Sequence, residues 1–410
     1  MADARELSIR RIGAQGDGVA DLDGEPVFVP FTLPGEQIEA EVDGDRARLL
    51  RVLKPSPERI TPVCKHFGKC GGCSVQHMAP DTYAEWKRNL VVDAFRSRGL
   101  EPVVDPLQRT AGKRRRAVMK AERTPEGVAL GFYEASSHDL VAIEECPVLE
   151  PKIVAALPGV GNLIAPLLSK RGEARVAITL TKSGLDVEIS GIERQLTPEV
   201  RTALATKASE MKLVRLVVRN EVVVETLHPF LSFGTADVIL PPGVFVQAVE
   251  EAETEIARRV VAASGKAKAV ADLFCGLGAF TFPLAARSRV SAFDGDKAAV
   301  AALTSAAKKT SGLKPVTATV RDLFREPLSP LELKEHDAVV FDPPRAGAEA
   351  QSQRLARSKV KTVVAVSCNP ATLARDARHL VDGGYKIESV TPIDQFLYSA
   401  HVEVVAVLRR

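Results

Sequence analysis

Three cysteines in a stretch of ten residues form the densest group of reactive side chains in this chain of 410 residues. The stretch, CKHFGKCGGC, contains Cys64, Cys70 and Cys73 in the spacing C-x5-C-x2-C. Zinc sites usually use two short pairs of ligands, whereas a triplet with one distant cysteine is typical of a four-iron cluster held by four thiolates. The spacing therefore favours a [4Fe-4S] cluster over a zinc site completed by His66 or His77.

The fourth ligand of such a cluster has three candidates, Cys146, Cys275 and Cys368. Cys146 is followed by a proline in IEECPVL, as is common at cluster ligands, whereas the other two lie in motifs with different chemistry. The start of the chain, MADARELSIRRIG, lacks the apolar core of a signal peptide, and no apolar run is long enough to span a membrane. We therefore predict a cytoplasmic protein with no membrane partner, whose clustered cysteines bind metal rather than form disulfides.

A second motif, ADLFCGLGAFTFPLA at residues 271–285, has the pattern of a strand, a glycine turn and the start of a helix. Gly276 and Gly278 allow the backbone to approach a ligand at the carboxyl end of the strand. A dinucleotide fingerprint requires a third glycine, and that position is Thr281 here. The turn therefore indicates a cofactor without a pyrophosphate, rather than a nicotinamide or flavin dinucleotide.

Acidic residues follow the next predicted strands of the same region. Asp294 lies about 20 residues after Asp272, where an acidic side chain binds ribose hydroxyls. Asp322, at the end of the third predicted strand, is placed to accept from an adenine amine, and Asp342 begins the sequence DPP after the fourth. Acidic groups at four consecutive strand ends repel phosphate and suit an adenosine that carries a sulfonium cation. The series predicts S-adenosylmethionine as the cofactor.

The sequence VVAVSCNP places Cys368 just past a buried strand, on a turn that opens onto the same crevice. Most cysteines are inert core residues, but one at a strand end beside a cofactor is a candidate nucleophile. The C5 carbon of uracil needs such a nucleophile, because a thiolate that adds to C6 makes C5 reactive towards a methyl sulfonium. A base must then remove the C5 proton, and the sequence HVE supplies Glu403 and His401. The valines beside Glu403 predict partial desolvation, which favours it as the base.

Three regions of different sequence character must position these residues. Residues 1–56 contain short alternating runs between Gly/Asp turns and predict a small barrel of the oligonucleotide-binding kind. Residues 57–240 mix helical and strand-like runs and include KRRRAVMKAER at 113–123, the best local candidate for a phosphate contact. Residues 241–410 alternate apolar runs with helical stretches, which predicts a Rossmann-like, largely parallel sheet ending in an antiparallel hairpin. The predicted fold class is multidomain α/β.

Together the motifs resemble those of the RNA uracil-5-methyltransferase family, and within it the bacterial 23S rRNA members with an N-terminal TRAM domain and an iron–sulfur cluster. The resemblance covers nearly the whole chain and rests on segments in family order: PFTLPGE, LKPSPERITPVCKHFGKCGGCSVQH, DLFCGLGAFTFPLA, DPPRAG, SCNP and HVE. It implies a TRAM-like barrel at 1–56, a central α+β iron–sulfur and RNA-recognition domain at 57–240, and an S-adenosylmethionine-dependent methyltransferase domain at 241–410.

The resemblance also implies roles for individual residues. It implies that a structural [4Fe-4S] cluster is held by Cys64, Cys70, Cys73 and Cys146. It implies that the S-adenosylmethionine site is lined by Gln247, Phe274, the backbone of Ala279, Asp294, Asp322 and Asp342. Cys368 is then the nucleophile and Glu403 the base. The chain departs from the family pattern at Asp294, where glutamate is usual, at Ala279, where some relatives have a polar residue, and at Leu397, where proline is common.

Two other functions fit parts of the sequence. A radical S-adenosylmethionine methylthiotransferase also combines a TRAM domain with a cluster, but it uses C-x3-C-x2-C and leaves one iron open, whereas Cys146 can close this site. A non-catalytic RNA-binding protein would have no need of Cys368 and Glu403. The net charge is only +3, so RNA binding must rest on local groups. We expect an RNA partner, 23S rRNA by resemblance, no DNA partner and a monomer.

Overall fold

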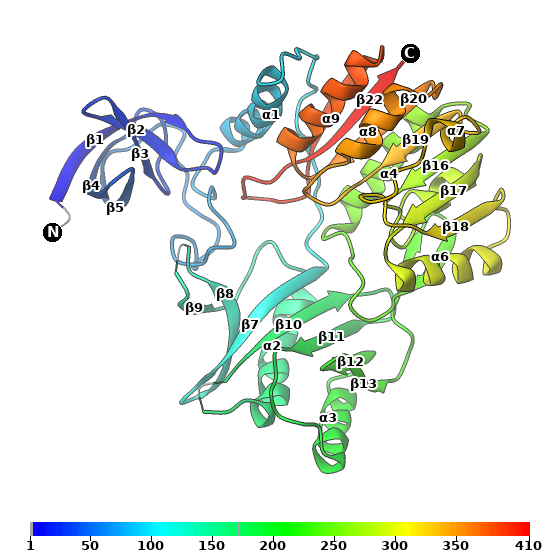
Figure 1. The fold of residues 1–410 in the computed structure, drawn as a ribbon. Coiled ribbons are helices and arrows are strands. Elements are labelled where there is room, and N and C mark those ends of the chain that lie inside the picture. The colour runs from blue at the N-terminus through cyan, green and yellow to red at the C-terminus, as the bar shows by residue number, and fades with distance from the viewer. Residues whose placement is uncertain (1–2, 136, 171) are drawn as a thin grey trace.

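The computed structural model describes residues 3–135, 137–170 and 172–410. The chain forms three lobes, which are an amino-terminal barrel, a central lobe on a mostly antiparallel sheet, and a carboxy-terminal lobe on a mostly parallel sheet (Figure 1). Within the described residues, no helix has both the length and the apolar character needed to cross a membrane.

The amino-terminal lobe is a closed barrel with the strand order β1-β2-β3-β5-β4. Its strands are β1 (Asp3–Ile12), β2 (Gly18–Leu22), β3 (Glu25–Val29), β4 (Gln37–Asp43) and β5 (Arg46–Lys54). Alternate residues point inward and form a small apolar core that includes Val29, Ile38 and Ala40. The predicted barrel is confirmed.

The central lobe has the sheet order β13-β12-β11-β10-β7-β8-β9, and its neighbouring strands are antiparallel except for β11 and β12. Its strands are β7 (Arg116–Thr124), β8 (Gly127–Tyr133), β9 (Leu140–Ala142), β10 (Glu173–Leu180), β11 (Leu185–Ser190), β12 (Arg215–Val218) and β13 (Glu221–Glu225). Its helical elements, which share one apolar core with the sheet, are α2 (Pro151–Ile164), η1 (Ala165–Leu167) and α3 (Pro198–Glu210). A hairpin follows, made of β14 (Phe230–Phe233) and β15 (Ala236–Ile239).

The carboxy-terminal lobe has the sheet order β18-β17-β16-β19-β20-β22-β21-β6. Its strands are β16 (Ala269–Leu273), β17 (Arg289–Asp294), β18 (Val316–Val320), β19 (Ala338–Phe341), β20 (Thr362–Ser367), β21 (Lys386–Asp394) and β22 (Glu403–Arg409). The strands β16 to β20 are parallel, and β22 runs antiparallel to both β20 and β21. The predicted parallel sheet and its final antiparallel pair are confirmed.

Helices cover both faces of this sheet. They are α1 (Pro80–Arg96), α4 (Glu250–Ser264), α5 (Thr281–Ala285), α6 (Lys297–Lys309), α7 (Pro330–Leu333), α8 (Glu349–Ala356) and α9 (Pro370–Asp382). In β20, Val363 and Ala365 join the core formed with α1, α8 and α9, whereas Val364 and Val366 join the core formed with α4. A strand buried on both faces needs a continuous apolar run, which explains the sequence VVAV.

Two elements from the segment after the barrel join the carboxy-terminal sheet. Helix α1 packs against α9 (Figure 1), and β6 (Gln108–Arg109) pairs in parallel with the edge strand β21. Lys87 Nζ of α1 lies 2.6 Å from Asp394 Oδ1 at the end of β21, and the Tyr83 hydroxyl donates to Asp394 Oδ2 at 2.7 Å. Lys87 also donates to the carbonyl of Phe396 at 2.9 Å. Helix α1 therefore fixes the start of the loop between β21 and β22.

Replacing Lys87 by methionine is expected to lower the free energy of unfolding by about 3–5 kcal/mol, because it leaves the buried Asp394 carboxylate without its charged partner. The double variant Lys87→Met/Asp394→Leu removes both charges and should recover part of that loss. Urea denaturation followed by circular dichroism measures both effects. A single variant as stable as the wild type would show that the ion pair does not stabilise the docking of α1.

Candidate active site

One cavity of about 770 Å³ lies at the carboxyl ends of the parallel strands, between the carboxy-terminal sheet and the central lobe. All the residues predicted for cofactor binding and catalysis line it: Gln247, Phe274, Ala279, Asp294, Asp322, Asp342, Cys368 and Glu403. Parallel strands end at one edge of a sheet, which explains why residues far apart in the sequence meet here.

The glycine turn after β16 contributes several lining residues. Phe274 and Gly278 have positive φ angles of 59° and 96°. A Cβ atom at Gly278 would lie 2.7 Å from the ring of Phe282, so only glycine fits this turn. Thr281, at the third position of a dinucleotide fingerprint, donates from its hydroxyl to Asp272 Oδ2 at 2.5 Å. This bond ties the start of α5 to the end of β16, which a glycine could not do.

The next two acidic residues are held by backbone amides. Asp294 ends β17 and accepts hydrogen bonds from the amides of Gly276 and Asp296, each at 2.8 Å. It therefore supports the glycine turn as well as lining the cavity. Asp322 lies in the loop after β18 rather than at the strand end, and its carboxylate accepts from the Phe324 amide at 3.0 Å.

A chain of side-chain hydrogen bonds connects Asp342 to Glu403. Gln247 Nε2 donates to Asp342 Oδ2 at 3.1 Å. Gln395 Nε2 donates to Gln247 Oε1 at 2.8 Å and to Glu403 Oε2 at 3.2 Å. Sequence reasoning did not identify Gln395, because its partners Gln247 and Glu403 lie on other elements.

Burial and mutual repulsion govern the charges of this site. Burial raises the pKa of Asp272 to about 7, and it also raises the pKa of Asp342. Burial and the neighbouring Asp342 raise the pKa of Glu403 well above its ordinary value. Burial, with Glu403 and Asp342, raises the pKa of the Cys368 thiol to about 11, which the Arg345 guanidinium opposes. A cavity with these charges favours a cationic ligand over an anionic one.

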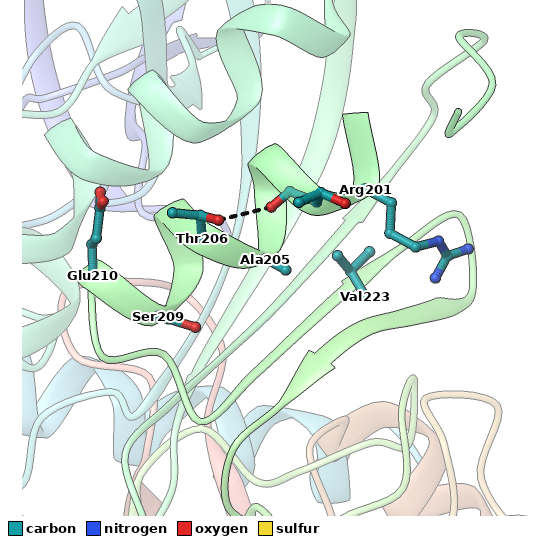
Figure 2. Close-up of a pocket in the computed structure, with 7 residues that line it drawn as sticks. Arg201, Ala205, Thr206, Ser209, Glu210 and Val223 are labelled. Carbon is teal, nitrogen blue, oxygen red and sulfur yellow. Dashed lines mark hydrogen bonds between the residues drawn. The ribbon is translucent and has the colours of Figure 1, made fainter. Parts of the chain in front are cut away.

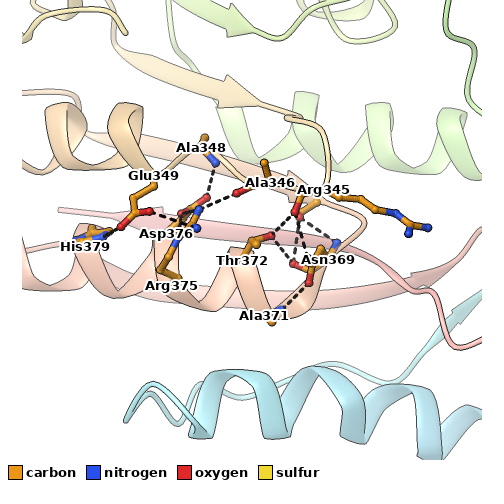
Figure 3. Close-up of polar contacts among 11 residues, drawn as sticks. Arg345, Ala346, Ala348, Glu349, Asn369, Ala371, Thr372, Arg375, Asp376 and His379 are labelled. Atoms are coloured by element: carbon orange, nitrogen blue, oxygen red, sulfur yellow. Dashed lines mark hydrogen bonds and ion pairs between the residues drawn. The ribbon is translucent and has the colours of Figure 1, made fainter. Parts of the chain in front are cut away.

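The residues after Cys368 are tied to the DPPRAG loop, as Figure 3 shows. Asn369 caps α9, and its side-chain amide donates to the carbonyl of Arg345 at 3.1 Å. The Thr372 hydroxyl donates to the same carbonyl at 3.3 Å. These bonds fix the strand end that carries Cys368 relative to the loop that begins with Asp342.

A second set of contacts in Figure 3 holds the same loop. Asp376 accepts from the Ala348 amide at 2.6 Å and from the Arg375 guanidinium at 2.7 Å. A Cβ atom at Gly347, where φ is 80°, would lie 2.6 Å from Arg375 Nη2, so the loop can approach α9 closely only with glycine. The SCNP and DPPRAG motifs therefore form one structural unit.

The cysteine triplet lies against the segment that carries Cys146. The Glu144 amide donates to His66 Nε2 at 3.3 Å, and Lys65 Nζ lies 2.5 Å from Glu144 Oε2. Burial raises the pKa of the Cys73 thiol to about 11, and the three other cysteines of the predicted set add to the rise. The four cysteines of the predicted set therefore lie near enough to one another to affect the pKa of Cys73.

Backbone amides lie close to two of these cysteines. The Gly72 amide donates to Cys70 Sγ at 3.4 Å, and the nearby backbone amides of Val148 and Leu149 oppose the rise that burial causes in the pKa of the Cys146 thiol. Hydrogen bonds of this kind stabilise thiolates and are common around iron–sulfur clusters. Among the residues that the structure describes, no three His, Cys, Asp or Glu side chains converge closely enough to hold a single metal ion.

Comparison with known proteins gives the family. The tRNA (uracil-5-)-methyltransferase family matches residues 240–410, and the TRAM domain matches residues 4–51. An RNA methyltransferase of Brucella suis is 50% identical over 406 residues, which cover 99% of this chain and 98% of that protein. The 23S rRNA (uracil(1939)-C(5))-methyltransferase RlmD of Chromohalobacter salexigens is 34% identical over 434 residues, which cover 100% of this chain and 90% of that protein. The chain belongs to the RNA uracil-5-methyltransferase family.

A solved structure of similar fold is that of Pyrococcus abyssi tRNA (uracil-54, C5)-methyltransferase in complex with S-adenosyl-L-homocysteine. It is 24% identical, covers 98% of this chain and 99% of its own, and has a TM-score of 0.77. At this identity the likeness establishes the fold. The family resemblance drawn from the motifs is confirmed, as is the TRAM domain at the amino terminus.

In this methyltransferase the basic stretch at 113–123 does not form a simple solvated strand face. Arg115 is buried, and its guanidinium donates to the Gln247 carbonyl at 3.2 Å and to Glu253 Oε1 at 2.9 Å. The Arg115 amide also donates to the Ala248 carbonyl at 2.8 Å. The residue therefore joins the central lobe to the segment that carries Gln247, and it is not available to bind phosphate.

The two arginines on either side of Arg115 line the cavity. The guanidinium of Arg114 lies 5.7 Å from the ring centre of Phe396, and that of Arg116 lies 5.8 Å from the ring centre of Phe245. Pairs of cationic and aromatic groups bind nucleic-acid bases and phosphates. The density of arginines in KRRR was the available sequence signal for this surface, but it gave no indication of which arginine faces inward.

A second hollow lies on the outer surface of α3 and includes Val223 of β13 (Figure 2). Its lining is mostly exposed, and the Thr206 hydroxyl donates to the Thr202 carbonyl within the helix at 3.0 Å. The predicted catalytic and metal-binding residues lie elsewhere. This hollow is therefore not a candidate for the reaction of the family.

Proposed function

We propose that this enzyme transfers a methyl group from S-adenosylmethionine to C5 of a uridine in RNA through a covalent adduct with Cys368. The supporting observation is that Cys368 and Glu403 line the same cavity as the acidic residues at the strand ends. A nucleophile, a buried carboxyl and a cation-favouring cofactor site within one cavity are what C5 methylation requires.

The proposed reaction uses the two residues in sequence. The Cys368 thiol loses its proton to solvent, and the thiolate adds to C6 of the uracil while the C5–C6 electrons form an enolate. When bound, S-adenosylmethionine supplies an electrophilic methyl group to C5. The Glu403 carboxylate then takes the C5 proton, the C6–S bond breaks, and the Cys368 thiolate leaves. Each cycle replaces one C5 hydrogen with a methyl group and releases one proton.

The acidic residues fit the cofactor. We assign the ribose hydroxyls to Asp294 and the adenine amine to Asp322, with Phe274, Gln247 and the backbone of Ala279 completing the site. Phe274 and Phe324 have ring centres 5.4 Å apart, so the cavity offers aromatic surface beside Asp322. Asp342 adds a buried carboxyl to the same cavity, which would favour the positive charge of the cofactor.

Replacing Asp294 by alanine is expected to weaken S-adenosylmethionine binding about 10- to 100-fold, because hydrogen bonds to a carboxylate are lost at the ribose. Asp294 also accepts a hydrogen bond from the Gly276 amide. The variant Asp294→Asn keeps an acceptor there and should lose less affinity for S-adenosylmethionine. Asp382→Ala, an exposed aspartate on α9, is the matched control. Calorimetric titration measures all three. An unchanged affinity for Asp294→Ala would place the ribose elsewhere.

We propose that the substrate is 23S rRNA and that DNA is not a partner. We also propose that the protein acts in the cytoplasm as a monomer, with functional domains at residues 1–56, 57–240 and 241–410. The Chromohalobacter relative, named for a 23S rRNA uridine, supports the substrate. The TRAM barrel and the Arg–aromatic pairs of the cavity support RNA binding. The class of RNA is therefore inferred from the relative, and the contact with RNA is inferred from the arginines that line the cavity.

We propose that Cys64, Cys70, Cys73 and Cys146 hold a structural [4Fe-4S] cluster. The proximity of the four thiols and the Gly72 amide that donates to Cys70 Sγ support this proposal. The four-iron core is larger than one ion, so its ligands stand further apart than those of a zinc site. The Nε2 atom of His66 accepts from a backbone amide, which disfavours it as a zinc ligand.

Anaerobically purified protein is expected to be brown and to contain about four irons per chain. Cys146→Ser should lose this iron, because one of the four thiolates is removed. Cys275→Ser should keep it, because Cys275 lines the cavity in the glycine turn. Iron and zinc analysis with visible absorption measures the difference. Colourless wild-type protein with one zinc per chain would contradict the cluster.

The proposed function is tested with RNA that contains 5-fluorouridine. After methyl transfer the adduct carries fluorine at C5 in place of the proton, so Glu403 cannot complete elimination and the enzyme stays bound to the RNA. A band of reduced mobility on a denaturing gel, dependent on S-adenosylmethionine, is expected. A non-catalytic RNA-binding protein gives no such band. A radical methylthiotransferase needs the cluster beside the cofactor, whereas the described lining of the cavity contains none of the four cluster cysteines.

A further inference from the structure

Gln395 is a buried polar residue whose side chain bonds to two residues of the proposed active site. It follows β21 directly and is 1% exposed. Its amide nitrogen donates to Gln247 Oε1 at 2.8 Å and to Glu403 Oε2 at 3.2 Å. Burying an amide is costly unless it is hydrogen-bonded, and here both bonds go to residues that line the cavity.

The second oxygen of the Glu403 carboxyl has no hydrogen-bond partner among the residues that the structure describes. Glu403 Oε1 is buried and makes no hydrogen bond, although Oε2 accepts from Gln395. A carboxyl group held by one oxygen presents the other in a fixed direction. We propose that Gln395 is a positioning residue, which holds Glu403 so that Oε1 remains free to take the C5 proton of the substrate. This inference rests on the proposed function of Glu403.

The backbone around Gln395 is itself immobilised, which allows the side chain to act as a fixed support. The preceding residue, Asp394, is bound by Lys87 and Tyr83 of α1. Further along the same loop, the Tyr398 carbonyl accepts from the amides of Ser74 and Val75 at 2.9 and 3.3 Å. The loop is thus anchored on both sides of Gln395 and the Glu403 carboxyl is held against a rigid partner.

A buried glutamine elsewhere in the chain shows what a purely structural role looks like. Gln351 is also 1% exposed, but both ends of its side-chain amide bond to the backbone of Leu328, at 2.8 and 3.2 Å. Those bonds join α8 to the loop before α7. Gln395 instead bonds to side chains of the cavity, and its own Oε1 is buried without a partner. Gln351 therefore provides a matched control.

The charged groups around Glu403 determine how the loss of Gln395 should change the pH at which Glu403 ionises. Asp342, from the end of β19, and the thiol of Cys368, after β20, are its titratable neighbours on the adjoining strands. His401 precedes it in the same loop and pairs with Arg345 at 3.0 Å. Neither Asp342 nor Cys368 donates a hydrogen bond to the Glu403 carboxyl. The Gln395 amide does donate to it, and this bond stabilises the ionised carboxylate. Removing it should shift ionisation of Glu403 to higher pH.

The test compares Gln395→Met with Gln351→Met in the full-length protein. For Gln395→Met we expect a fall of about 10- to 100-fold in kcat, the effect of one hydrogen bond to a charged group. The acid limb of the pH–rate profile should move to higher pH, and the covalent protein–RNA adduct should accumulate on ordinary uridine RNA. Affinity for S-adenosylmethionine should change less than kcat. Gln351→Met should retain the wild-type pH profile and kcat.

Two outcomes overturn the inference. Gln395→Met with the wild-type pH profile and kcat would show that Glu403 needs no support from this amide. An equal fall in kcat for Gln351→Met, with no movement of the acid limb in either variant, would show a general packing effect. Trapping of the wild-type enzyme by 5-fluorouridine RNA is measured in parallel. If the wild type is not trapped, the proposed function fails, whereas trapping with an unaltered Gln395→Met refutes the positioning role alone.

Discussion

Cys368→Ala is expected to abolish methylation and to form no covalent complex with RNA, whether the RNA contains uridine or 5-fluorouridine. Without addition at C6 no enolate forms, and C5 of uracil is not nucleophilic enough to accept a methyl group. Loss of a covalent nucleophile should reduce turnover by several orders of magnitude, to the limit of detection. Transfer of labelled methyl from S-adenosylmethionine to RNA measures the reaction, and a denaturing gel measures the adduct.

The structure predicts that this variant folds and still binds its ligands. Cys368 is only partly buried, and the bonds that position its turn come from Asn369 and Thr372 rather than from the sulfur. Calorimetric affinity for S-adenosylmethionine should therefore stay near the wild-type value. Methylation of C5 by Cys368→Ala at a measurable fraction of the wild-type rate would show that the reaction does not pass through an adduct on this residue.

Because the pKa of the Cys368 thiol is raised, the reaction requires the thiol to lose its proton before it can add to the uracil. With a pKa of about 11 in the ligand-free protein, the thiol is almost fully protonated at neutral pH. Asp342 and Glu403 cause part of this rise, so a cation in the cavity offsets them and lowers the pKa. Alkylation of Cys368 by a neutral reagent should accordingly become faster as pH rises.

The site could be predicted from the sequence wherever its geometry follows from strand order. Asp294 ends a parallel strand, Asp342 and Cys368 each follow one, and the carboxyl ends of such strands meet at one edge. Asp322 was assigned to a strand end and lies in the following loop, because strand boundaries depend on pairing that periodicity does not show. Even so, a loop at the same edge reaches the same cavity.

Contacts between distant segments could not be predicted in the same way. The bond between Lys87 and Asp394 joins residues 307 positions apart. The same holds for Gln395, whose partner Gln247 lies 148 positions away. Composition likewise marked 113–123 as basic, but burial of Arg115 depends on the position of Glu253 on another lobe. Local sequence carries no information on such pairings until the lobes are placed together.

Glu403→Gln is expected to separate the two halves of the reaction. Addition and methyl transfer precede proton loss, so both can still occur, but the amide cannot take the C5 proton. Removal of a general base costs about 10²- to 10⁴-fold in rate. The methylated adduct should therefore accumulate on ordinary uridine RNA, as a protein–RNA band that carries label from the methyl group of S-adenosylmethionine.

The buried position of Glu403 explains why this residue, and not His401, is expected to be the base. Burial and Asp342 raise the pKa of Glu403, which makes its carboxylate a stronger base than an exposed glutamate, although less of it is ionised at neutral pH. His401 is exposed and already accepts from Arg345. A His401→Gln variant should therefore eliminate the adduct normally. Wild-type turnover by Glu403→Gln, with adduct accumulation in His401→Gln instead, would assign the proton transfer to the histidine.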